Sequence, residues 1–414
     1  MICKKISCLI VILMMLFSFG IPASAQPAEK NTAESAGQNA AESAEKNTAE
    51  SAEQKAAEAA VQTTAESAVL MEVGTGEILF EKNADKELPP ASVTKVMTLL
   101  VALEAVENGK VKLTDTVAAS ENASKMGGSQ IYLEQGEEMD LKTMLISIAV
   151  GSANDACVAV AEHIAGSHEV YVEMMNDKAA ELGLKHTKFI NSYGLPAEGH
   201  YTSARDLAVL TREAIKYPLF NELTTIKKHD LRGGEFVLLN TNKLLWWYRG
   251  AEGGKTGWTS EAKYCLASTA RRDNLRLIAV VMASPEPRSH FRESMKLYNY
   301  GFAQYEYVPV AKEGQVLGQV RVLKGTVDNI TVAPRVDVST VIQKGHKKDV
   351  THKVNLVSTV TAPVANGQTI GDIKVYEGKE EVLKVDLVAT REIPKGMPFR
   401  HMFTLMRAAY NYQQ

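Results

Sequence analysis

The sequence contains little that could hold the chain together covalently, because it has four cysteines in 414 residues. Two of these, Cys3 and Cys8, lie near the N-terminus, so the rest of the chain can form at most one disulfide, between Cys157 and Cys265. One pair does not make a disulfide scaffold. We favour two buried free thiols as the interpretation, with a single bridge as the alternative.

The chain also lacks a strong charge of either sign. Its formal net charge is −3 at pH 7, and nothing in the composition suggests nucleic-acid binding. The zinc-peptidase motif HExxH is absent as well. The hydrophobic content of 45% is, in contrast, sufficient for real cores in two or three domains.

The longest apolar run near the N-terminus, Leu9 to Phe19, is shorter than the roughly 20 residues that cross a bilayer. Lys4 and Lys5 precede it, and the small residues Ala23-Ser24-Ala25 follow. This pattern predicts a secretory signal over residues 1–25, and a retained transmembrane helix is the alternative. No cysteine adjoins the small-residue site, so we expect an exported protein that is not a lipoprotein.

Residues 26–66 have too little apolar surface to form a core. They carry a charge of −5 from eight Glu and three Lys, and a repeat of eight residues runs through residues 31–68, beginning NTAESAGQ, NAAESAEK. A period of eight drifts around a helix and forms no continuous apolar stripe. We predict a solvated spacer, with a surface-binding repeat as the alternative.

The pattern of a folded domain begins near Ser67 and extends to residue 305. Two strand-like runs flank Gly74-Thr75-Gly76 as in a hairpin. Strands at both ends around a helical middle predict a split α/β sheet domain with a helical insert. The expected helices span residues 93–106, 141–164, 171–182 and 204–215, and the later strands span residues 264–268 and 275–282.

Short alternating runs replace the helical pattern over residues 306–390. Turn signals such as Asn366-Gly367 separate them, which predicts a small, separate all-β domain. The runs are VDV at 336–338, VNL at 354–356, IKV at 373–375 and LKVDL at 383–387.

The tail, residues 391–414, has the pattern of an amphipathic helix. Its charge of +3 favours a helix that lies in a membrane interface, and a helix docked on the β-domain is the alternative. The apolar face consists of Phe399, Met402, Phe403, Met406 and Tyr410.

The motif SxxK occurs three times, but only Ser92-Val93-Thr94-Lys95 lies at a predicted helix start. Ser43 to Lys46 lies in the spacer, and Ser260 to Lys263 lies in a turn-like segment. Residues i and i+3 of a helix share one face, so Lys95 can reach the Ser92 hydroxyl. Burial and the helix N-terminus both favour the neutral amine that a general base requires. The alternative is a helix cap at Ser92 and a surface lysine.

Two further motifs follow along the chain. Ser152 and Asn154 lie at a junction between an apolar run and the next helix, whereas the rival pair Ser120 and Asn122 lies in a polar stretch. Lys255-Thr256-Gly257 occurs once, just ahead of strand-like sequence. There a glycine allows the backbone of a substrate to approach closely.

SxxK, SxN and KTG in this order resemble the penicillin-recognising serine enzymes. The sequence around these motifs narrows the resemblance to one family, the D-alanyl-D-alanine carboxypeptidases, which are low-molecular-mass penicillin-binding proteins. The resemblance covers residues 67 to about 390. It implies a β-lactamase/transpeptidase-like α/β domain, with an antiparallel sheet flanked by helices and a helical subdomain, followed by a small all-β domain. The segments that carry the resemblance are LMEVGTGEILFEKNADKELPPASVTKVMT, NSYGLPAEGHYTSARDLAVL and GGKTGWTSEAKYCLASTA. A further segment resembles the family's membrane-anchoring tail, IPKGMPFRHMFTLMRAAYNY.

By this resemblance Ser92 attacks the carbonyl of the penultimate D-alanine of a peptidoglycan stem peptide, and Lys95 accepts its proton. Ser152 relays the proton to the leaving amine, and Asn154 holds the amide carbonyl of the substrate. Cys157 would then lie near the site, either sensitive to thiol reagents or simply buried as a small apolar residue.

The resemblance also implies the groups that bind the rest of the substrate. Lys255 and Thr256 of the KTG motif, completed by Gly257, would bind the terminal carboxylate. The backbone N–H groups of Ser92 and Trp258 would form the oxyanion hole. Arg288 occupies the place of a family arginine near the carboxylate, although Arg292 is close in sequence.

The implied partners are peptidoglycan stem peptides, β-lactam antibiotics and the membrane surface, at the extracytoplasmic face of the cell membrane, with no metal or other cofactor. The sequence departs from the class A β-lactamases, because its middle motif is SAN and no ExxxN occurs between residues 155 and 254. The missing glutamate predicts slow turnover of penicillin. A β-lactamase and an inactive wall-associated scaffold are the alternative functions.

Overall fold

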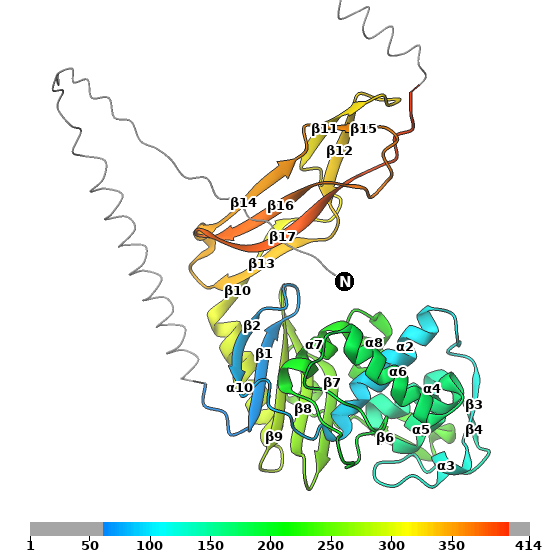
Figure 1. The fold of residues 1–414 in the computed structure, drawn as a ribbon. Helices are drawn as coiled ribbons and strands as arrows, with labels where there is room; N and C mark the ends of the chain where they lie inside the picture. The colour runs from blue at the N-terminus through cyan, green and yellow to red at the C-terminus, as the bar shows by residue number, and fades with distance from the viewer. Residues whose placement is uncertain (1–60, 397–414) are drawn as a thin grey trace, which may run out of the picture. The chain divides into compact units, whose positions relative to one another are not determined.

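The computed structural model describes residues 61–396, which contain an α/β part and an all-β part (Figure 1). The α/β part is built on a five-stranded antiparallel sheet with the strand order β2-β1-β9-β8-β7. The predicted hairpin at Gly74 and both later strands are confirmed. The strands are β1 (Ser67–Glu72), β2 (Ile78–Lys82), β7 (Ala251–Thr259), β8 (Lys263–Arg272) and β9 (Leu275–Ser284).

Both faces of this sheet are covered, because its central strands are apolar on both sides. Val69 and Ile278 belong to the large core shared with the helical region. Leu70 and Leu277 point to the other face, where both would touch a Cβ placed on Gly301 of α10 (Ser289–Gln304). The alternation of side chains along each strand therefore places helices on both faces.

The central helix of the α/β part is α2 (Lys95–Glu107), and ten of its 13 residues are buried. Such a helix has no polar face, so neighbouring helices surround it. The predicted helical middle is confirmed in these elements. The other helices are α3 (Glu121–Ser124), α4 (Leu141–Ile146), α5 (Asn154–Ala165), α6 (His168–Glu181), α7 (Ala204–Ala214), α8 (Pro218–Thr225) and α9 (Leu244–Trp247).

The helical pattern predicted over residues 141–164 is interrupted where the SxN motif lies. A π-helical turn, Ser147–Gly151, follows α4, and Ser152 then adopts a left-handed conformation with φ +62°. α5 begins at Asn154. Single π-turns inside helices often mark functional sites. Here the interruption gives the motif a backbone shape that a continuous helix could not have.

Several elements were not predicted from the sequence. They include α8, α10 and two short hairpins, β3 (Thr116–Ala118) with β4 (Glu138–Asp140) and β5 (Lys228–Leu231) with β6 (Phe236–Leu239). Lys255-Thr256-Gly257 lies ahead of the predicted strand, which is β8, but the motif is itself part of a strand that was not predicted, β7. Three glycines in nine residues masked this strand, since glycine is rare in strand interiors.

The part of the chain after Gln304 consists of strands, apart from one short 3-10 turn at Lys347–Asp349, as far as it is described. It contains a six-stranded sheet with the order β14-β16-β17-β12-β11-β15 and a two-stranded sheet of β10 and β13. The predicted all-β domain is therefore confirmed. Its strands are β10 (Tyr305–Ala311), β11 (Gly318–Leu323), β12 (Asn329–Pro334), β13 (Val338–Gln343), β14 (Val350–Leu356), β15 (Thr359–Thr361), β16 (Thr369–Glu377) and β17 (Glu380–Ala389).

The predicted signal, most of the spacer and most of the tail lie outside the described residues. The last residues of the predicted spacer do contact the sheet, because Lys82 Nζ donates hydrogen bonds to the carbonyls of Thr63 and Ala65 at 2.9 and 2.7 Å. Between residues 61 and 396, no helix has both the length and the apolar character needed to cross a membrane. The domain boundaries themselves remain predictions.

Candidate active site

The Ser92 hydroxyl is in direct contact with Lys95, as the SxxK spacing predicts. Ser92 lies in a 3-10 turn, Ala91–Thr94, and the α-helix begins only at Lys95. Side chains at i and i+3 eclipse in such a turn, so the contact forms, with Lys95 Nζ donating to Ser92 Oγ at 2.9 Å. The alternative of a surface lysine is wrong, because Lys95 is completely buried.

Lys95 Nζ has two more oxygen acceptors besides Ser92. It donates to the side-chain Oδ1 of Asn154 at 2.7 Å and to the backbone carbonyl of Tyr193 at 2.6 Å. Burial lowers the pKa of Lys95 from 10.5 to about 8, although the nearby Cys157 and Asp155 oppose this shift. A proton can therefore leave this amine near neutral pH.

The two carbonyl acceptors determine where the lone pair of a neutral Lys95 points. A carbonyl oxygen only accepts, so both N–H groups of the neutral amine are held by Asn154 and Tyr193, and the lone pair faces Ser92. The orientation of the Asn154 amide is itself set, because its Nδ2 donates to the Gly127 carbonyl at 2.7 Å. This arrangement is that of a general base aimed at a hydroxyl.

The SxN motif is brought to this lysine through Asn154. Asn154 is the first residue of α5, and its backbone N–H donates to the Ser129 carbonyl at 2.7 Å. Ser152, two residues earlier, is 4% exposed. The rival Ser120 only caps a short helix, because its hydroxyl accepts from the Ala123 N–H at 3.0 Å.

The KTG motif lies on β7, next to the turn that carries the nucleophile. A Cβ placed on Gly257 would be 2.9 Å from the Ser92 nitrogen and from the Pro90 carbonyl. Glycine is therefore required at position 257, because β7 and the turn that carries Ser92 lie too close together for a side chain. The sequence predicted that a substrate backbone would need this space, whereas the structure shows that the turn of Ser92 itself occupies it.

Lys255 and Thr256 differ in their surroundings. Lys255 is 1% exposed, and its Nζ donates to the Thr256 carbonyl at 2.9 Å. Burial and then the charge of Lys95 hold the pKa of Lys255 well below its usual range. The Thr256 hydroxyl is only part-buried and donates to the Thr241 hydroxyl at 2.7 Å. A bound carboxylate would offset the cost of charging Lys255.

Trp258 and Arg288 are the least enclosed of the predicted site residues. Trp258 is 58% exposed and its ring lies 6.1 Å from that of Tyr264. Arg288 is exposed at the start of α10, with its guanidinium 6.0 Å from the ring centre of Trp247. Arg292 instead forms an ion pair with Glu286 at 3.1 Å. No hydrogen bond connects either arginine to the KTG motif in the described structure.

A buried histidine, His200, contacts the turn that carries Ser92 through the Thr94 hydroxyl. Ala91 has φ +49°, a strained conformation for a residue with a side chain. Its carbonyl accepts from the Thr94 hydroxyl at 2.8 Å, and that hydroxyl lies 2.9 Å from Nε2 of His200. Nδ1 of His200 accepts from the Ile190 N–H at 3.0 Å, so Nε2 carries the proton.

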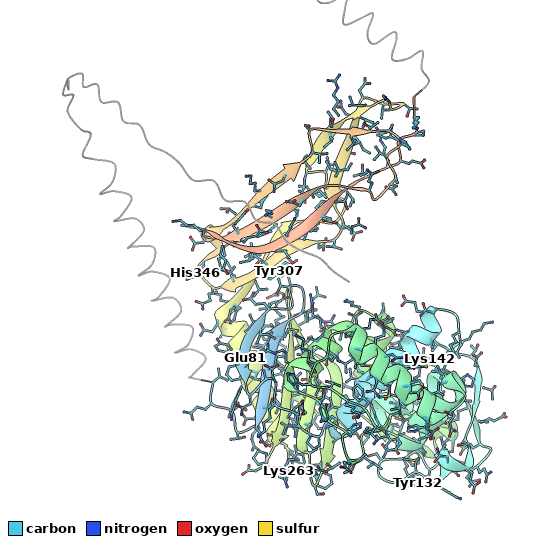
Figure 2. All side chains as sticks on the ribbon, viewed as in Figure 1. Glu81, Tyr132, Lys142, Lys263, Tyr307 and His346 are labelled. Carbon is cyan, nitrogen blue, oxygen red and sulfur yellow. The ribbon has the colours of Figure 1, made fainter. Side chains whose placement is uncertain are left out.

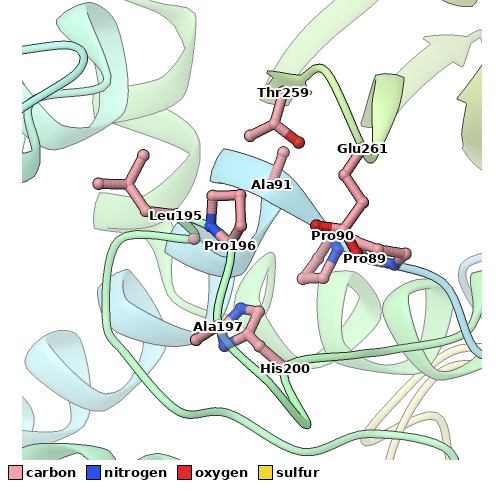
Figure 3. A pocket seen from close by; sticks show the side chains of 10 residues that line it. Pro89, Pro90, Ala91, Leu195, Pro196, Ala197, His200, Thr259 and Glu261 are labelled. Carbon is pink, nitrogen blue, oxygen red and sulfur yellow. The ribbon is translucent and has the colours of Figure 1, made fainter.

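A small pocket adjoins this turn and is lined by segments around Ala91, Leu195 and Thr259 (Figure 3). Neither Ser92 nor Lys95 belongs to its lining. We therefore assign the chemistry to the hydrogen-bonded groups around Lys95 and not to this pocket.

Sequence reasoning missed the contributions of Tyr193, His200 and Thr241. Tyr193 acts through its backbone carbonyl, which no residue type reveals. A signal was available in Gly194, because a Cβ there would lie 1.9 Å from the Ala91 carbonyl oxygen, so only glycine fits.

The two cysteines of the described chain are free and buried, as we favoured from the sequence. Burial raises the pKa of Cys157 to about 11, although the nearby Lys95 opposes the shift. Cys157 therefore lies near the site as a neutral, apolar side chain and not as a reactive thiolate.

A serine hydroxyl held by a buried lysine, beside an amide side chain and a strand edge, defines a serine acyl-transfer site. A family model described as D-alanyl-D-alanine carboxypeptidase matches residues 52–286. A second, described as the C-terminal domain of penicillin-binding protein 5, matches residues 305–395. The chain therefore belongs to the D-alanyl-D-alanine carboxypeptidase family.

Individual relatives agree with this assignment. The chain is similar to the D-alanyl-D-alanine carboxypeptidase DacF of Bacillus subtilis, 43% identical over 80% of this chain and 86% of the relative. Penicillin-binding protein 5 from Haemophilus influenzae matches with a TM-score of 0.71 and 32% identity, over 81% of this chain and 98% of that chain. Penicillin-binding protein D2 from Listeria monocytogenes in the ampicillin-bound form matches with a TM-score of 0.54 and 30% identity, over 58% and 98%.

Proposed function

We propose that this protein removes the terminal D-alanine from peptidoglycan stem pentapeptides through an acyl-enzyme at Ser92, and that penicillins acylate the same serine. The observation that carries the proposal is the hydrogen bond from Lys95 Nζ to Ser92 Oγ at 2.9 Å. The two carbonyls that orient a neutral Lys95 support its role as the base.

In the acylation step, Ser92 Oγ attacks the carbonyl carbon of the penultimate D-alanine and its proton passes to Lys95. The N–H groups of Ser92 and Trp258 stabilise the oxyanion. The carbon–nitrogen bond then breaks, Ser152 relays a proton to the departing amine, and D-alanine leaves. Water hydrolyses the ester and restores the Ser92 hydroxyl.

Lys255 and Thr256 bind the terminal carboxylate of the substrate, and Asn154 holds its amide carbonyl. Lys255 is buried, and among the residues that the structure describes its one acceptor is the Thr256 carbonyl, which supports this role. Arg288 is retained as a weaker candidate for the same carboxylate, because its present contact is with Trp247.

The decisive experiment separates the three candidate functions. The mature protein is incubated with a pentapeptide ending in D-Ala-D-Ala, and released D-alanine is compared with that from a Ser92→Ala variant. No release above this control would refute the carboxypeptidase. Fast multiple turnover of penicillin would identify a β-lactamase, and failure of penicillin to label Ser92 would identify an inactive scaffold.

We further propose that the protein acts outside the cytoplasm, at the membrane surface. The predicted signal in residues 1–25 and the amphipathic pattern of residues 391–414 support this location. Truncation before Pro398 should abolish binding to lipid vesicles. Equal partitioning of truncated and full-length protein would contradict the role of the tail.

A further inference from the structure

The hydroxyl of Thr256 already has a partner in the absence of substrate. Thr256 Oγ1 donates its proton to Thr241 Oγ1 at 2.7 Å, and in this geometry Thr241 is the acceptor, so its side chain must turn before it can donate in the other direction. A threonine hydroxyl has one proton, so a proton given to Thr241 is not available to a carboxylate. Binding of a substrate carboxylate at Thr256 must therefore change the hydrogen bond between the two threonines.

Two buried asparagines flank Thr241, and the first of them connects this segment to α8 through hydrogen bonds. Asn240 is fully buried, and its Nδ2 donates to the carbonyls of Thr224 and Ile226 at 3.0 and 2.8 Å. Its Oδ1 accepts from the Asn242 N–H at 2.8 Å, which bridges over Thr241. The backbone of Thr241 is therefore held on both sides.

The second asparagine ties the segment to the strand that carries the KTG motif. Asn242 is 1% exposed, and its Nδ2 donates to the Gly253 carbonyl of β7 at 2.9 Å. Its Oδ1 accepts from the Leu244 N–H at 3.1 Å. Because Thr241 is anchored to β7 in this way, its hydroxyl keeps its distance to Thr256 when the site is occupied.

We infer that Thr241 is a positioning residue for recognition of the substrate carboxylate. When the carboxylate binds, the hydrogen bond between the hydroxyls reverses, so that Thr241 donates to Thr256 and Thr256 donates to the carboxylate. Each oxygen keeps its own proton, the two hydroxyl groups rotate, and the Thr241 side chain turns slightly to become the donor. The inference rests on the proposed function, because that function places the carboxylate at Thr256.

This relay predicts a selective effect on charged substrates. An anion polarises a chain of two hydrogen bonds, and charge-assisted bonds are about twice as strong as neutral ones. A neutral ester gains little from the same chain. Thr241 should therefore favour a free carboxylate over an ester at the end of the substrate.

The test compares the mature wild-type protein with Thr241→Val and Thr241→Ser. Each variant receives the pentapeptide with a free C-terminal carboxylate and the same pentapeptide as its methyl ester. We expect Thr241→Val to lower kcat/KM for the free acid about tenfold, mainly through KM, and for the ester less than about twofold. Thr241→Ser keeps the hydroxyl and should stay within about threefold of wild type for both.

Thr225→Val is the matched control, because Thr225 is exposed and its hydroxyl donates to the carbonyls of Asn221 and Glu222 in its own helix, at 2.7 and 3.0 Å. An equal loss for acid and ester in Thr241→Val would indicate a merely structural role and would overturn the inference. An unchanged acid-to-ester ratio would overturn it too. If Thr241→Val does not fold, Thr241→Ser and Thr241→Ala are compared by the ratio of kcat/KM for the acid to kcat/KM for the ester. A wild-type ratio in Thr241→Ser with a reduced ratio in Thr241→Ala supports the inference. Equal ratios in both variants overturn it.

Failure of the proposed function has a different signature, because wild-type protein would then release neither D-alanine from the free acid nor D-alanine methyl ester from the ester. In that case the labelling rates of Ser92 with a penicillin and its methyl ester replace the peptides. A Thr241→Val variant that labels with the wild-type ratio of rates overturns the inference about Thr241.

Discussion

Two fully buried lysines lie in the site, and they differ in what surrounds their ammonium groups. Lys95 has three oxygen acceptors and a pKa lowered to about 8. Within residues 61–396, Lys255 has one acceptor, the Thr256 carbonyl, and its pKa is held well below its usual range. The same residue type is thus surrounded differently in the two places, in agreement with the proposed roles of a base at Lys95 and an anion-binding group at Lys255.

The comparison teaches that burial alone does not assign a role to a lysine. Burial lowers the pKa of both, and the oxygen atoms around each group then decide what it does. Around Lys95 they hold two N–H groups and direct the lone pair to Ser92. Around Lys255 the described residues provide no such set, and we therefore propose that its other N–H groups bind the substrate.

The largest effect is expected from Lys95→Met, which removes the base. The rate of Ser92 acylation by penicillin should fall about 10³-fold, within the range that a general base contributes. Lys263→Met is the matched control, because Lys263 belongs to the SxxK motif at residues 260–263 and is exposed at the first residue of β8 (Figure 2). Mass spectrometry measures the labelling of Ser92 in each variant, and a comparable loss in both would contradict the assignment of Lys95 as the base.

A smaller and more selective effect is expected from Lys255→Met. The variant loses a charge-assisted bond to the carboxylate, so kcat/KM for the free-acid pentapeptide should fall about 50-fold. The methyl ester should lose much less. If both substrates lost activity equally, Lys255 would act on the chemistry and not on recognition, and the contrast with Lys95 would disappear.

The pH dependence of acylation sharpens the role of Lys95. The neutral amine is the reactive form, and its fraction rises as pH increases through the pKa of about 8. Below that value the acylation rate should increase about tenfold per pH unit, and above it the rate should level off. Stopped-flow measurements between pH 6 and 9.5 test this, and a flat profile would show that Lys95 is already neutral.

The smallest expected effect is on the free energy of unfolding, which should depend on pH through two buried histidines, His200 and His290. Burial lowers the pKa of each to about 4. As pH falls below about 6.5, these histidines bind protons in the unfolded chain but stay neutral in the folded chain. The free energy of unfolding therefore decreases between about pH 6.5 and 4. Each should contribute up to about 1.4 kcal/mol per pH unit.

Denaturant unfolding at several pH values measures this contribution. His200→Gln should reduce the slope of the free energy of unfolding against pH between about pH 6.5 and 4. Equal slopes in wild type and His200→Gln would mean that His200 is protonated in the folded protein.

Much of the site was predictable because its motifs are local. Ser92 and Lys95 are one turn apart in either kind of helix, so their contact followed from spacing, although the α-helix begins at Lys95, two residues later than predicted. The π-turn before Ser152 lies where the sequence placed a junction. Gly257 was correctly marked as a point of close approach, but the sequence did not show that the turn of Ser92 packs there, and the approach of a substrate stays a prediction.

By itself, the sequence determined the order of the motifs, the family resemblance and the chemistry that Ser92 and Lys95 can perform. These properties depend on side-chain type and on short distances along the chain. The tertiary structure alone decided that the Tyr193 carbonyl orients Lys95, that Thr241 meets Thr256 and that Arg288 lies against Trp247. Such contacts join distant segments, often through backbone atoms that every residue shares, and so they leave no mark in the order of residue types.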